Sequence, residues 1–352
     1  MRGERPLLIL AFAFFSLALY ALLALHSPVL TKESVEIKVP KGASFKEVLR
    51  DLREKGLIKN PWILYLYGRL SQKDSQIKAG HYLVEPFQSP KDLFELLSQG
   101  KGLAVKVTIP EGLTLREVAE KLKEKGLIDS EQDFLALCQD EDFIRSLGLE
   151  ALSLEGYLFP DTYYFDLSAR PEEIVKVMVE NFLKKWDPSF SKRAKELGLT
   201  EYEVLILASI IEKEALLSEE KPLISAVFHN RLKRRMPLCA DPTVIYGLKQ
   251  SYWNFDLKRK HLKTPTPYNT YLLKGLPPTP ICNPGLGSIK AALYPAKVPY
   301  LYFVSRNDGS HYFSTTYKEH LEAVYLYQKG GLKAQAQSTG VDETQAEFYP
   351  PN

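Results

Sequence analysis

The feature that most constrains this fold is an internal repeat, in which residue 37 aligns with residue 107 and residue 58 with residue 128. One copy begins Ile37-Lys-Val-Pro-Lys-Gly, the other begins Val107-Thr-Ile-Pro-Glu-Gly, and both end in Glu-Lys-Gly-Leu-Ile. A spacing that stays constant over a whole segment indicates two copies of one supersecondary unit. We therefore expect two small units of the same design, at 36–102 and 103–165.

Each copy has the sequence of a short strand, a Pro-x-Gly turn and a helix. Ser44 and Thr114 each precede a Glu by three residues, which is the spacing of a capping box at a helix start. Gly56 and Gly126 stand where a helix commonly ends in a left-handed residue. The sequence therefore predicts a helix of about ten residues in each copy.

A strand, a tight turn and a helix that ends in Lys-Gly-Leu-Ile resemble LysM, the small sugar-binding module of cell-wall proteins. Strands within 79–84 and 154–165 are expected to close the two units, and an acidic helix is expected at 130–147 of the second. The alternative is that the two units form a structural spacer that binds no glycan.

The N-terminal segment is apolar. Residues 7–25 carry no charge, and Arg2 and Arg5 precede them. About 20 apolar residues are enough to cross a bilayer as a helix, and preceding basic residues favour a cytoplasmic N-terminus. We predict a cytoplasmic N-terminus at 1–6 and an uncleaved transmembrane anchor at 7–25 in the cell inner membrane, with the rest of the chain periplasmic or extracytoplasmic. A cleaved signal peptide, whose apolar region is usually about 7–15 residues, is the alternative.

A different pattern begins near residue 166. Pro171 suits the first position of a helix, and Ile174, Val175, Met178 and Phe182 share one face of it. We expect a third domain at 166–328 and a disordered tail at 329–352, where Gln, Ala, Ser and Thr occur without periodicity. The predicted class is α+β: a transmembrane helix, LysM-like α+β units and a mixed α/β domain.

Composition excludes several functions. The chain has 46 basic and 43 acidic residues without a Lys/Arg block, which argues against a nucleic-acid partner. Its three cysteines include no Cys-x-x-Cys pair, and the sequence has no zinc-peptidase, nucleophile-elbow or phosphate-loop motif. We therefore expect no metal and no cofactor. Cys239 and Cys282 are either a disulfide or two free thiols.

The chemistry is expected on a helix that begins at Glu201, because Thr200-Glu-Tyr-Glu is a capping box. Glu212 falls on an apolar stripe of this helix. The other members of the stripe are Leu205, Ala208, Ser209, Ala215 and Leu216. Burial penalises a charged carboxyl, so the pKa of Glu212 should rise and suit a general acid, whereas Glu214, about 200° further around, should be more exposed. The alternative is that Glu212 pairs with an arginine such as Arg231 and only holds helices together.

The segment Leu207-Ala-Ser-Ile-Ile-Glu-Lys-Glu resembles the catalytic segment of the endolytic murein transglycosylases, the MltG or YceG-like family. Further segments follow in the order of that family, so the resemblance covers nearly the whole chain. They are Ser153-Leu-Glu-Gly-Tyr-Leu-Phe-Pro-Asp-Thr-Tyr, Val227-Phe-His-Asn-Arg-Leu, Asp241-Pro-Thr-Val-Ile-Tyr-Gly, Thr266-Pro-Tyr-Asn-Thr-Tyr, Gly275-Leu-Pro-Pro and His311-Tyr-Phe. Where the family usually has Leu-Gln-x-Asp-Pro-Thr, this chain has Leu238-Cys-Ala-Asp-Pro-Thr, so Cys239 replaces that Gln.

The resemblance implies a lytic transglycosylase that cleaves the MurNAc-β-1,4-GlcNAc bond of nascent peptidoglycan, leaves a 1,6-anhydro-MurNAc end and so terminates or trims strand elongation. Glu212 would protonate the leaving oxygen and then deprotonate the sugar's own C6 hydroxyl, which removes the need for a second carboxylate. Glycan strands are the implied substrate, and penicillin-binding peptidoglycan synthases are the implied protein partners. A muramidase-type hydrolase and a non-catalytic cell-wall-binding scaffold are the alternatives.

Other residues are expected around Glu212. Asp241 is either a second carboxylate or the N-cap of a short helix that ends at Gly247. Asn269 is the first candidate for a polar substrate contact, and Asn230 and Arg231 should contact substrate or support the wall of the cleft. The remaining substrate-binding candidates are Thr243, Tyr246, Tyr268 and Thr270. Tyr252, Trp253, Phe255 and Tyr271 extend an aromatic stretch that suits either sugar faces or a core.

Overall fold

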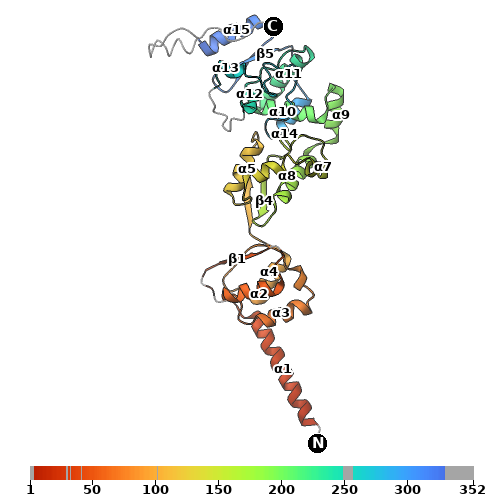
Figure 1. Ribbon diagram of the computed structural model, residues 1–352, viewed down its shortest axis with the longest axis vertical. Coiled ribbons are helices and arrows are strands. Elements are labelled where there is room, and N and C mark those ends of the chain that lie inside the picture. The colour runs from red at the N-terminus through yellow and green to blue at the C-terminus, as the bar shows by residue number, and fades with distance from the viewer. Residues whose placement is uncertain are drawn as a thin grey trace, which may run out of the picture. The chain divides into compact units, whose positions relative to one another are not determined.

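The computed structural model describes residues 4–28, 31, 33–40, 42–100, 102–248 and 257–329. They form two compact units (Figure 1). The first comprises the residues up to 107 together with 125–127 and 164–170, and the second comprises the others. Helices predominate, and the described residues also form three two-stranded sheets, so the predicted α+β class is confirmed.

The first unit contains the first copy of the repeat. Its elements are α1 (Glu4–His26), β1 (Val35–Val39), α2 (Phe45–Glu54), α3 (Pro61–Leu70), the short 3-10 helix η1 (Asp74–Gln76), β2 (Gly80–Val84) and α4 (Pro90–Gln99). β1 and β2 are antiparallel, with Val35 opposite Val84 and Val39 opposite Gly80, so the predicted strand at 79–84 is present. The core of this unit includes the fully buried Tyr82.

The second copy of the repeat follows the same order of strands and helices. Its elements are β3 (Ala104–Thr108), α5 (Leu115–Glu124), α6 (Glu131–Leu137), α7 (Glu141–Ser146) and β4 (Thr162–Asp166). β3 pairs with β4 as β1 pairs with β2. The single acidic helix predicted at 130–147 is wrong, because the side chain of Asp140 accepts a hydrogen bond from the Phe143 N–H at 2.6 Å and starts a second helix.

The predicted capping boxes are present in both copies. The Glu47 N–H donates to the Ser44 hydroxyl at 3.3 Å, and the Ser44 N–H donates back to the Glu47 carboxylate at 2.7 Å. Thr114 and Glu117 make the same pair of bonds at 3.2 and 2.8 Å. These bonds satisfy amide groups that a helix start leaves without partners, so four side chains fix where the two helices begin.

The rest of the second unit is mainly helical. It contains α8 (Pro171–Lys185), α9 (Pro188–Leu197), α10 (Glu201–Glu214), η2 (Ser218–Glu220), α11 (Lys221–Lys233), α12 (Asp241–Gly247), α13 (Arg259–Leu262), α14 (Leu286–Leu293), β5 (Tyr302–Ser305), β6 (His311–Ser314), α15 (Tyr317–Val324) and η3 (Tyr325–Lys329). α8 begins at Pro171 as predicted, and its expected core face is buried. The strands β5 and β6 form an antiparallel hairpin.

Helix α10 lies at the centre of the second unit. Every residue from Val204 to Ile211 is buried, and α10 packs against α9, α11, α12 and α14. The predicted single apolar stripe is therefore wrong, because this helix has no solvent face over two turns. Its end was also predicted too late: α10 stops at Glu214, and Leu216 beyond it is 79% exposed.

The two chain ends bear on earlier predictions. Helix α1 covers the apolar segment at 7–25. Among the residues that the structure describes, no helix combines the length and the apolar character needed to cross a membrane, so the predicted transmembrane helix is not confirmed. The predicted disordered tail falls, from residue 330 onward, outside the described residues.

Asn283 joins the second copy of the repeat to the loop before α14. Its side-chain oxygen accepts hydrogen bonds from the N–H groups of Gly156 and Leu158 at 3.0 and 2.9 Å. Its side-chain amide donates to the carbonyl of Leu113 at 2.9 Å, and the residue is fully buried. The side-chain amide thus satisfies two buried N–H groups and adds a second bond to the Leu113 carbonyl, which also accepts from the Asn283 N–H at 2.8 Å.

We expect Asn283→Ala to lower the free energy of unfolding of the second unit by about 3 kcal/mol or more, because each buried group left without a partner costs about 1–3 kcal/mol. Denaturant unfolding followed through the fluorescence of Trp186, which lies in this unit, measures the loss. Asn181→Ala is the control, because the Asn181 amide donates to two side chains, those of Asp161 and Tyr163, and to no backbone group among the described residues. Equal effects of the two substitutions would contradict this account.

Candidate active site

The last turn of α10 carries three charged residues, Glu212, Lys213 and Glu214, and all three are half-buried. The turn ends where Ala215 adopts an extended conformation with φ −86° and ψ 116°. Because the preceding two turns are packed on every side, these polar side chains meet neighbouring elements rather than open solvent. Each has a different set of partners.

Glu212 is held in an ion pair. Lys221 Nζ, at the start of α11, lies 3.0 Å from Oε1, and the Gly285 N–H donates to Oε2 at 2.9 Å. The side chains of Glu212 and Lys221 are each only 8% exposed. Both carboxylate oxygens are therefore engaged. Glu212 does form the ion pair considered as an alternative to catalysis, but its partner is Lys221 and not Arg231.

Glu111 lies beside this pair, with its carboxylate 3.8 Å from Lys221 Nζ. Burial, and next the negative charge of Glu212, raise the pKa of Glu111, while Lys221 opposes the rise. Lys213 points elsewhere and donates to the carbonyl of Gly112 at 3.1 Å. The Lys213 contact joins α10, and the Glu111 contact joins α11, to the turn that follows β3 in the second repeat copy.

Glu214 has no such anchoring. Burial and then the negative charge of Asp241 raise the pKa of Glu214 to about 8, against the opposing charge of Arg231. The residues described by the structure supply no hydrogen bond to its carboxyl group. A carboxylate at the last residue of a helix also faces the negative end of the helix dipole. Both effects favour the protonated form of Glu214. Glu214 and Glu212 are both half-buried, so the prediction that Glu214 is the more exposed of the two is not confirmed.

Asp241 is the first residue of α12, and the N-cap is Ala240. Asp241 would be the N-cap only if the helix began at residue 242. The N-cap interpretation of Asp241 is therefore wrong. The Tyr271 hydroxyl donates instead to its carboxylate at 2.5 Å. Asp241 is an exposed residue overall, but the protein surrounds its carboxyl group. This burial raises the pKa of Asp241, and the hydrogen bond from Tyr271 partly opposes the rise. Its carboxylate lies within electrostatic range of Glu214.

Arg231 supports one side of this site. Its Nε donates to the carbonyl of Leu301 at 2.7 Å and its Nη1 to that of Leu238 at 2.8 Å, while the guanidinium stacks over the ring of Tyr302 at 5.3 Å. Arg231 thereby fixes the segment that leads to Asp241. The amide of Asn230 is likewise used internally, donating at 2.9 Å to two backbone carbonyls of the segment before β5.

Three predicted substrate contacts lie inside the protein. Thr243, Asn269 and Thr270 are fully buried. The hydroxyls of Thr243 and Thr270 lie 2.8 Å apart, and Thr270 also accepts from the Ala240 N–H at 2.9 Å. Asn269 donates to two backbone carbonyls and accepts from the Tyr271 N–H at 3.0 Å. The prediction of a direct substrate contact by Asn269 is therefore wrong, because its amide shapes the turn that carries Tyr271 to Asp241.

A further buried acid, Glu155, was not identified from the sequence. The Tyr246 hydroxyl donates to its Oε2 at 2.9 Å and the Leu115 N–H to its Oε1 at 3.0 Å. Glu155 is 2% exposed, and burial raises its pKa to about 8. Tyr268 packs edge-on against Tyr246 with ring centres 4.9 Å apart. A lone charge in the apolar run Leu154-Glu-Gly-Tyr-Leu-Phe was the available signal.

The three cysteines are free thiols, which resolves the alternatives for Cys239 and Cys282. The Cys282 thiol donates to the Ser209 carbonyl at 3.3 Å. Cys239 has a positive φ of 49°, which few residues other than glycine adopt, and its N–H donates to the Thr270 carbonyl at 3.1 Å. The described residues contain no group of three or more side chains able to hold a metal ion. Tyr252, Trp253 and Phe255 lie outside the described residues.

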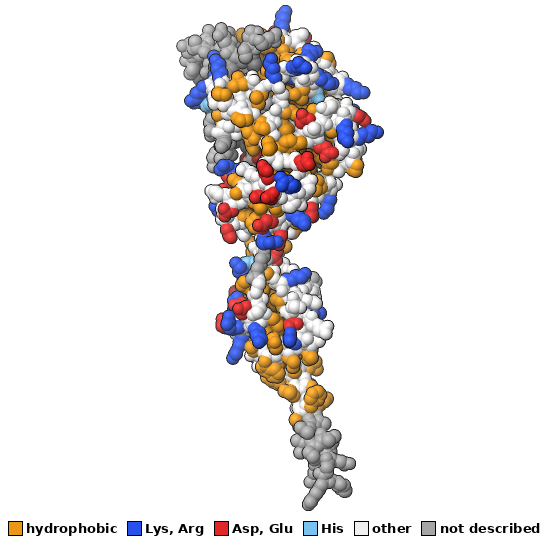
Figure 2. All heavy atoms as spheres, turned by 45° about the vertical axis from the view of Figure 1, so that its right-hand side comes forward, with side chains coloured by type: hydrophobic (Ala, Val, Ile, Leu, Met, Phe, Trp, Pro, Cys, Tyr) orange, Lys and Arg blue, Asp and Glu red, His pale blue; other side chains and the backbone are white. Residues whose placement is uncertain are grey.

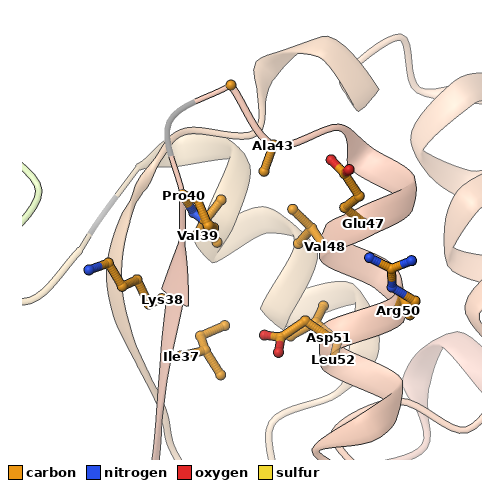
Figure 3. Close-up of a pocket in the computed structure, with 11 residues that line it drawn as sticks. Ile37, Lys38, Val39, Pro40, Ala43, Glu47, Val48, Arg50, Asp51 and Leu52 are labelled. Atoms are coloured by element: carbon orange, nitrogen blue, oxygen red, sulfur yellow. The ribbon is translucent and has the colours of Figure 1, made fainter.

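A second candidate site lies in the first unit. A hollow of about 460 Å³ lies between β1 and the start of α2, and Figure 3 shows the residues that line it. Ile37, Val39, Val48 and Leu52 form its floor, and charged side chains that include Arg50 and Asp51 stand at its edge. This combination of an apolar floor and a few polar groups is typical of small-ligand sites.

Comparisons with known proteins agree on one family. The model of the YceG-like family matches residues 37–325. An endolytic murein transglycosylase of Bacillus subtilis is 32% identical over 313 residues, which are 84% of this chain and 86% of that protein. One of Streptococcus pneumoniae serotype 2 is 31% identical over 320 residues, which are 82% of this chain and 58% of that protein. The crystal structure of a YceG-like protein from Listeria monocytogenes is 32% identical, with a TM-score of 0.57 over 83% of this chain and 100% of that one.

The two glutamates should respond oppositely to amidation. A carboxyl whose pKa is raised on folding makes the folded state bind more protons than the unfolded state, so stability falls as pH rises from about 5 to about 8. We expect Glu214→Gln to match the parent chain at pH 5 and to exceed its stability at pH 8 by at least about 1.4 kcal/mol, the equivalent of one pKa unit. Denaturant unfolding at the two pH values measures this.

Glu212→Gln is the matched comparison, two residues away on the same turn. It removes the nearer of the two carboxylates beside the buried Lys221 and leaves only Glu111, at 3.8 Å, so stability should fall at both pH values. A stability gain at pH 8 for Glu212→Gln, with none for Glu214→Gln, would reverse the assignment of the two environments.

Proposed function

Since this chain belongs to the YceG-like family, we propose that its peptidoglycan chemistry takes place at the end of α10, with Glu214 as the general acid and base. The chain is an endolytic murein transglycosylase, the activity that names its Bacillus and pneumococcal relatives. The observation that carries the residue assignment is a contrast in contacts. The Glu214 carboxyl accepts no hydrogen bond from the described residues and burial raises its pKa to about 8, whereas Glu212 is held by Lys221 and the Gly285 N–H.

A lytic transglycosylase needs one group that first gives and then takes a proton. Protonated Glu214 donates its proton to the glycosidic oxygen as the bond from that oxygen to C1 of MurNAc breaks. The resulting carboxylate then accepts the proton of the C6 hydroxyl of the same sugar. As that proton leaves, the C6 hydroxyl oxygen forms a bond to C1. The product is a 1,6-anhydro ring, no water is consumed, and Glu214 ends protonated.

The sequence pointed to Glu212 for this role, and the contacts favour its neighbour. Lys221 Nζ lies 3.0 Å from one carboxylate oxygen of Glu212, and the Gly285 N–H donates to the other at 2.9 Å, so both oxygens are already engaged within the protein. Glu212 instead positions the last turn of α10 against α11 and the loop before α14.

Asp241 is the second group of the proposed site. Its carboxylate, oriented by Tyr271, contributes to the raised pKa of Glu214 and can stabilise the positive charge that develops at C1. The same two carboxyls would also suit a muramidase-type hydrolase that activates water, so this remains the second candidate mechanism. The mass of the product separates them, because an anhydro end is lighter than a reducing end by one water.

We expect Glu214→Gln to lower turnover of purified glycan strands by about 10²–10⁴-fold, the usual contribution of a general acid or base. Activity of the parent chain should fall as pH rises through about 8, because Glu214 then loses the proton that it must donate. Mass analysis of the anhydro-ended products measures both effects.

Glu212→Gln is the control for this experiment. Because this variant should be less stable, its folded fraction is measured at the same time and its activity is compared per folded molecule. Folded Glu212→Gln should keep much more activity than Glu214→Gln. Near-normal anhydro product from Glu214→Gln, together with loss from folded Glu212→Gln, would restore the role first predicted for Glu212. A non-catalytic scaffold would require a parent chain that binds strands without cleaving them.

Two further proposals concern the first unit. We propose that the hollow between β1 and α2 is the place where a LysM-like unit contacts glycan. Arg50→Ala should then weaken binding of the full chain to glycan strands in a pull-down, whereas Lys91→Ala, on α4 outside this hollow, should not. Equal binding by the two variants would favour the spacer alternative.

We also propose that α1 attaches the chain to the outer face of the inner membrane. The support is the row of exposed apolar side chains on this helix, among them Phe12, Phe15, Leu19 and Leu23 at 46–74% exposure. Such a surface is unfavourable in water. The single-pass topology and the synthase partners stay predictions.

A further inference from the structure

Helix α3 is apolar on both of its faces. Its inner face, with Ile63, Leu64 and Gly68, is buried in the first unit. Its outer face presents Trp62, Leu66 and Leu70, which are 52%, 48% and 77% exposed. Their spacing of four residues places the three side chains along one stripe. Most helices at a protein surface carry polar residues on the outer face, so this stripe needs a partner other than water.

The helix that carries the stripe packs beside the apolar helix α1. Helix α1 packs against α3 and α4, and the Asn60 amide at the start of α3 donates to the Tyr20 hydroxyl at 2.9 Å. A hollow of about 380 Å³ between the two helices is lined mainly by apolar residues that include Leu23, Ile58 and Ile63. Figure 2 shows hydrophobic side chains gathered over the end of the first unit from which α1 emerges.

The hydrogen bond between Asn60 and Tyr20 fixes the position along α1 at which the start of α3 lies. Tyr20 lies six residues before His26, the last residue of α1, and at 1.5 Å per residue this is roughly 9 Å below the end of the helix. Any surface that takes up the apolar side chains of α1 as far as Leu23 therefore also meets Trp62. Trp and Tyr at such a level are typical of the boundary between lipid and water.

Basic residues flank α3. Lys59, two residues before it, is exposed, and the side chain of Arg69 near its end is 62% exposed and forms an ion pair with Asp74 at 3.0 Å. Basic residues flanking an apolar helix face are attracted to acidic lipid headgroups.

We propose that the outer face of α3 lies on the lipid surface, with Trp62, Leu66 and Leu70 inserted at the level of the headgroups. The inference rests on the proposed attachment by α1 and extends it: the first unit is held against the membrane by a second helix and does not hang from α1 alone. The partner is a bilayer that contains anionic phospholipid.

The test uses the full chain in vesicles of phosphatidylcholine and phosphatidylglycerol. The chain has three tryptophans, so Trp186→Phe combined with Trp253→Phe leaves Trp62 as the only one. Its emission should be quenched when the lipids carry bromine near the headgroup end of the acyl chains. Trp186, kept alone in a matched variant, belongs to the second unit and should not be quenched.

Leu66→Gln with Leu70→Gln should reduce the quenching of Trp62 and shift its emission to the red. Leu183→Gln is the control, because Leu183 is a similarly exposed leucine, 45%, in the second unit. These side chains point to solvent in the isolated protein, so the variants should fold, and circular dichroism checks this.

Vesicle flotation separates this inference from the attachment on which it rests. A chain that floats while Trp62 stays unquenched overturns the role of α3 and leaves attachment by α1 intact. A chain that does not float overturns both. An unquenched, blue-shifted Trp62 in a dimer would show that a second copy covers the stripe, which also overturns the inference. Cleavage of soluble glycan strands by the same variants reports separately on the catalytic proposal.

Discussion

The second unit depends on the complete burial of helix α10. Eight consecutive residues, Val204 to Ile211, have almost no contact with water, and burying a Val, Leu or Ile side chain contributes roughly 1.5–3 kcal/mol each. No other helix in the described chain carries so long a buried run. The surrounding helices must therefore enclose α10, and its polar last turn meets three of them at once.

That enclosure decides what each polar group of the last turn can do. Glu212 meets a lysine and a backbone N–H, so its charge is balanced. Burial, the negative charge of Asp241 and the negative end of its own helix all raise the pKa of Glu214. One turn thus holds an ion-paired carboxylate and a carboxyl group of raised pKa two residues apart. Similar separations of paired carboxyls underlie acid–base catalysis in other glycan-cleaving enzymes.

The surrounding polar residues serve this arrangement from a distance. Thr270 and Asn269 shape the turn that brings Tyr271 to Asp241. Arg231 holds the segment of Cys239, where the positive φ of 49° makes the residue type matter. Because these side chains satisfy buried backbone groups, their substitution would alter the geometry of the site without touching a substrate. These residues lie in the segments that resemble the YceG-like family. Their role in folding explains their presence there as well as a role in chemistry would.

Much of the local structure follows from the sequence alone. The repeat, the capping boxes at Ser44, Thr114 and Thr200, and the helix start at Pro171 depend on residues close together in the chain, and all are present. The position of α10 as the carrier of acidic residues also follows from its pattern. These features need only short-range hydrogen bonds and hydrophobic spacing.

The roles of the acidic residues were decided by tertiary structure. Helical spacing places Glu212 and Glu214 on different sides of α10, but it cannot tell which side meets Lys221 and which meets Asp241, because both partners come from other helices. The same holds for Asp241 and Glu155, which accept hydrogen bonds from tyrosines 30 and 91 residues away along the chain. Electrostatic environment depends on what is close in space, and in a helix enclosed on every side the sequence of that helix does not contain this information.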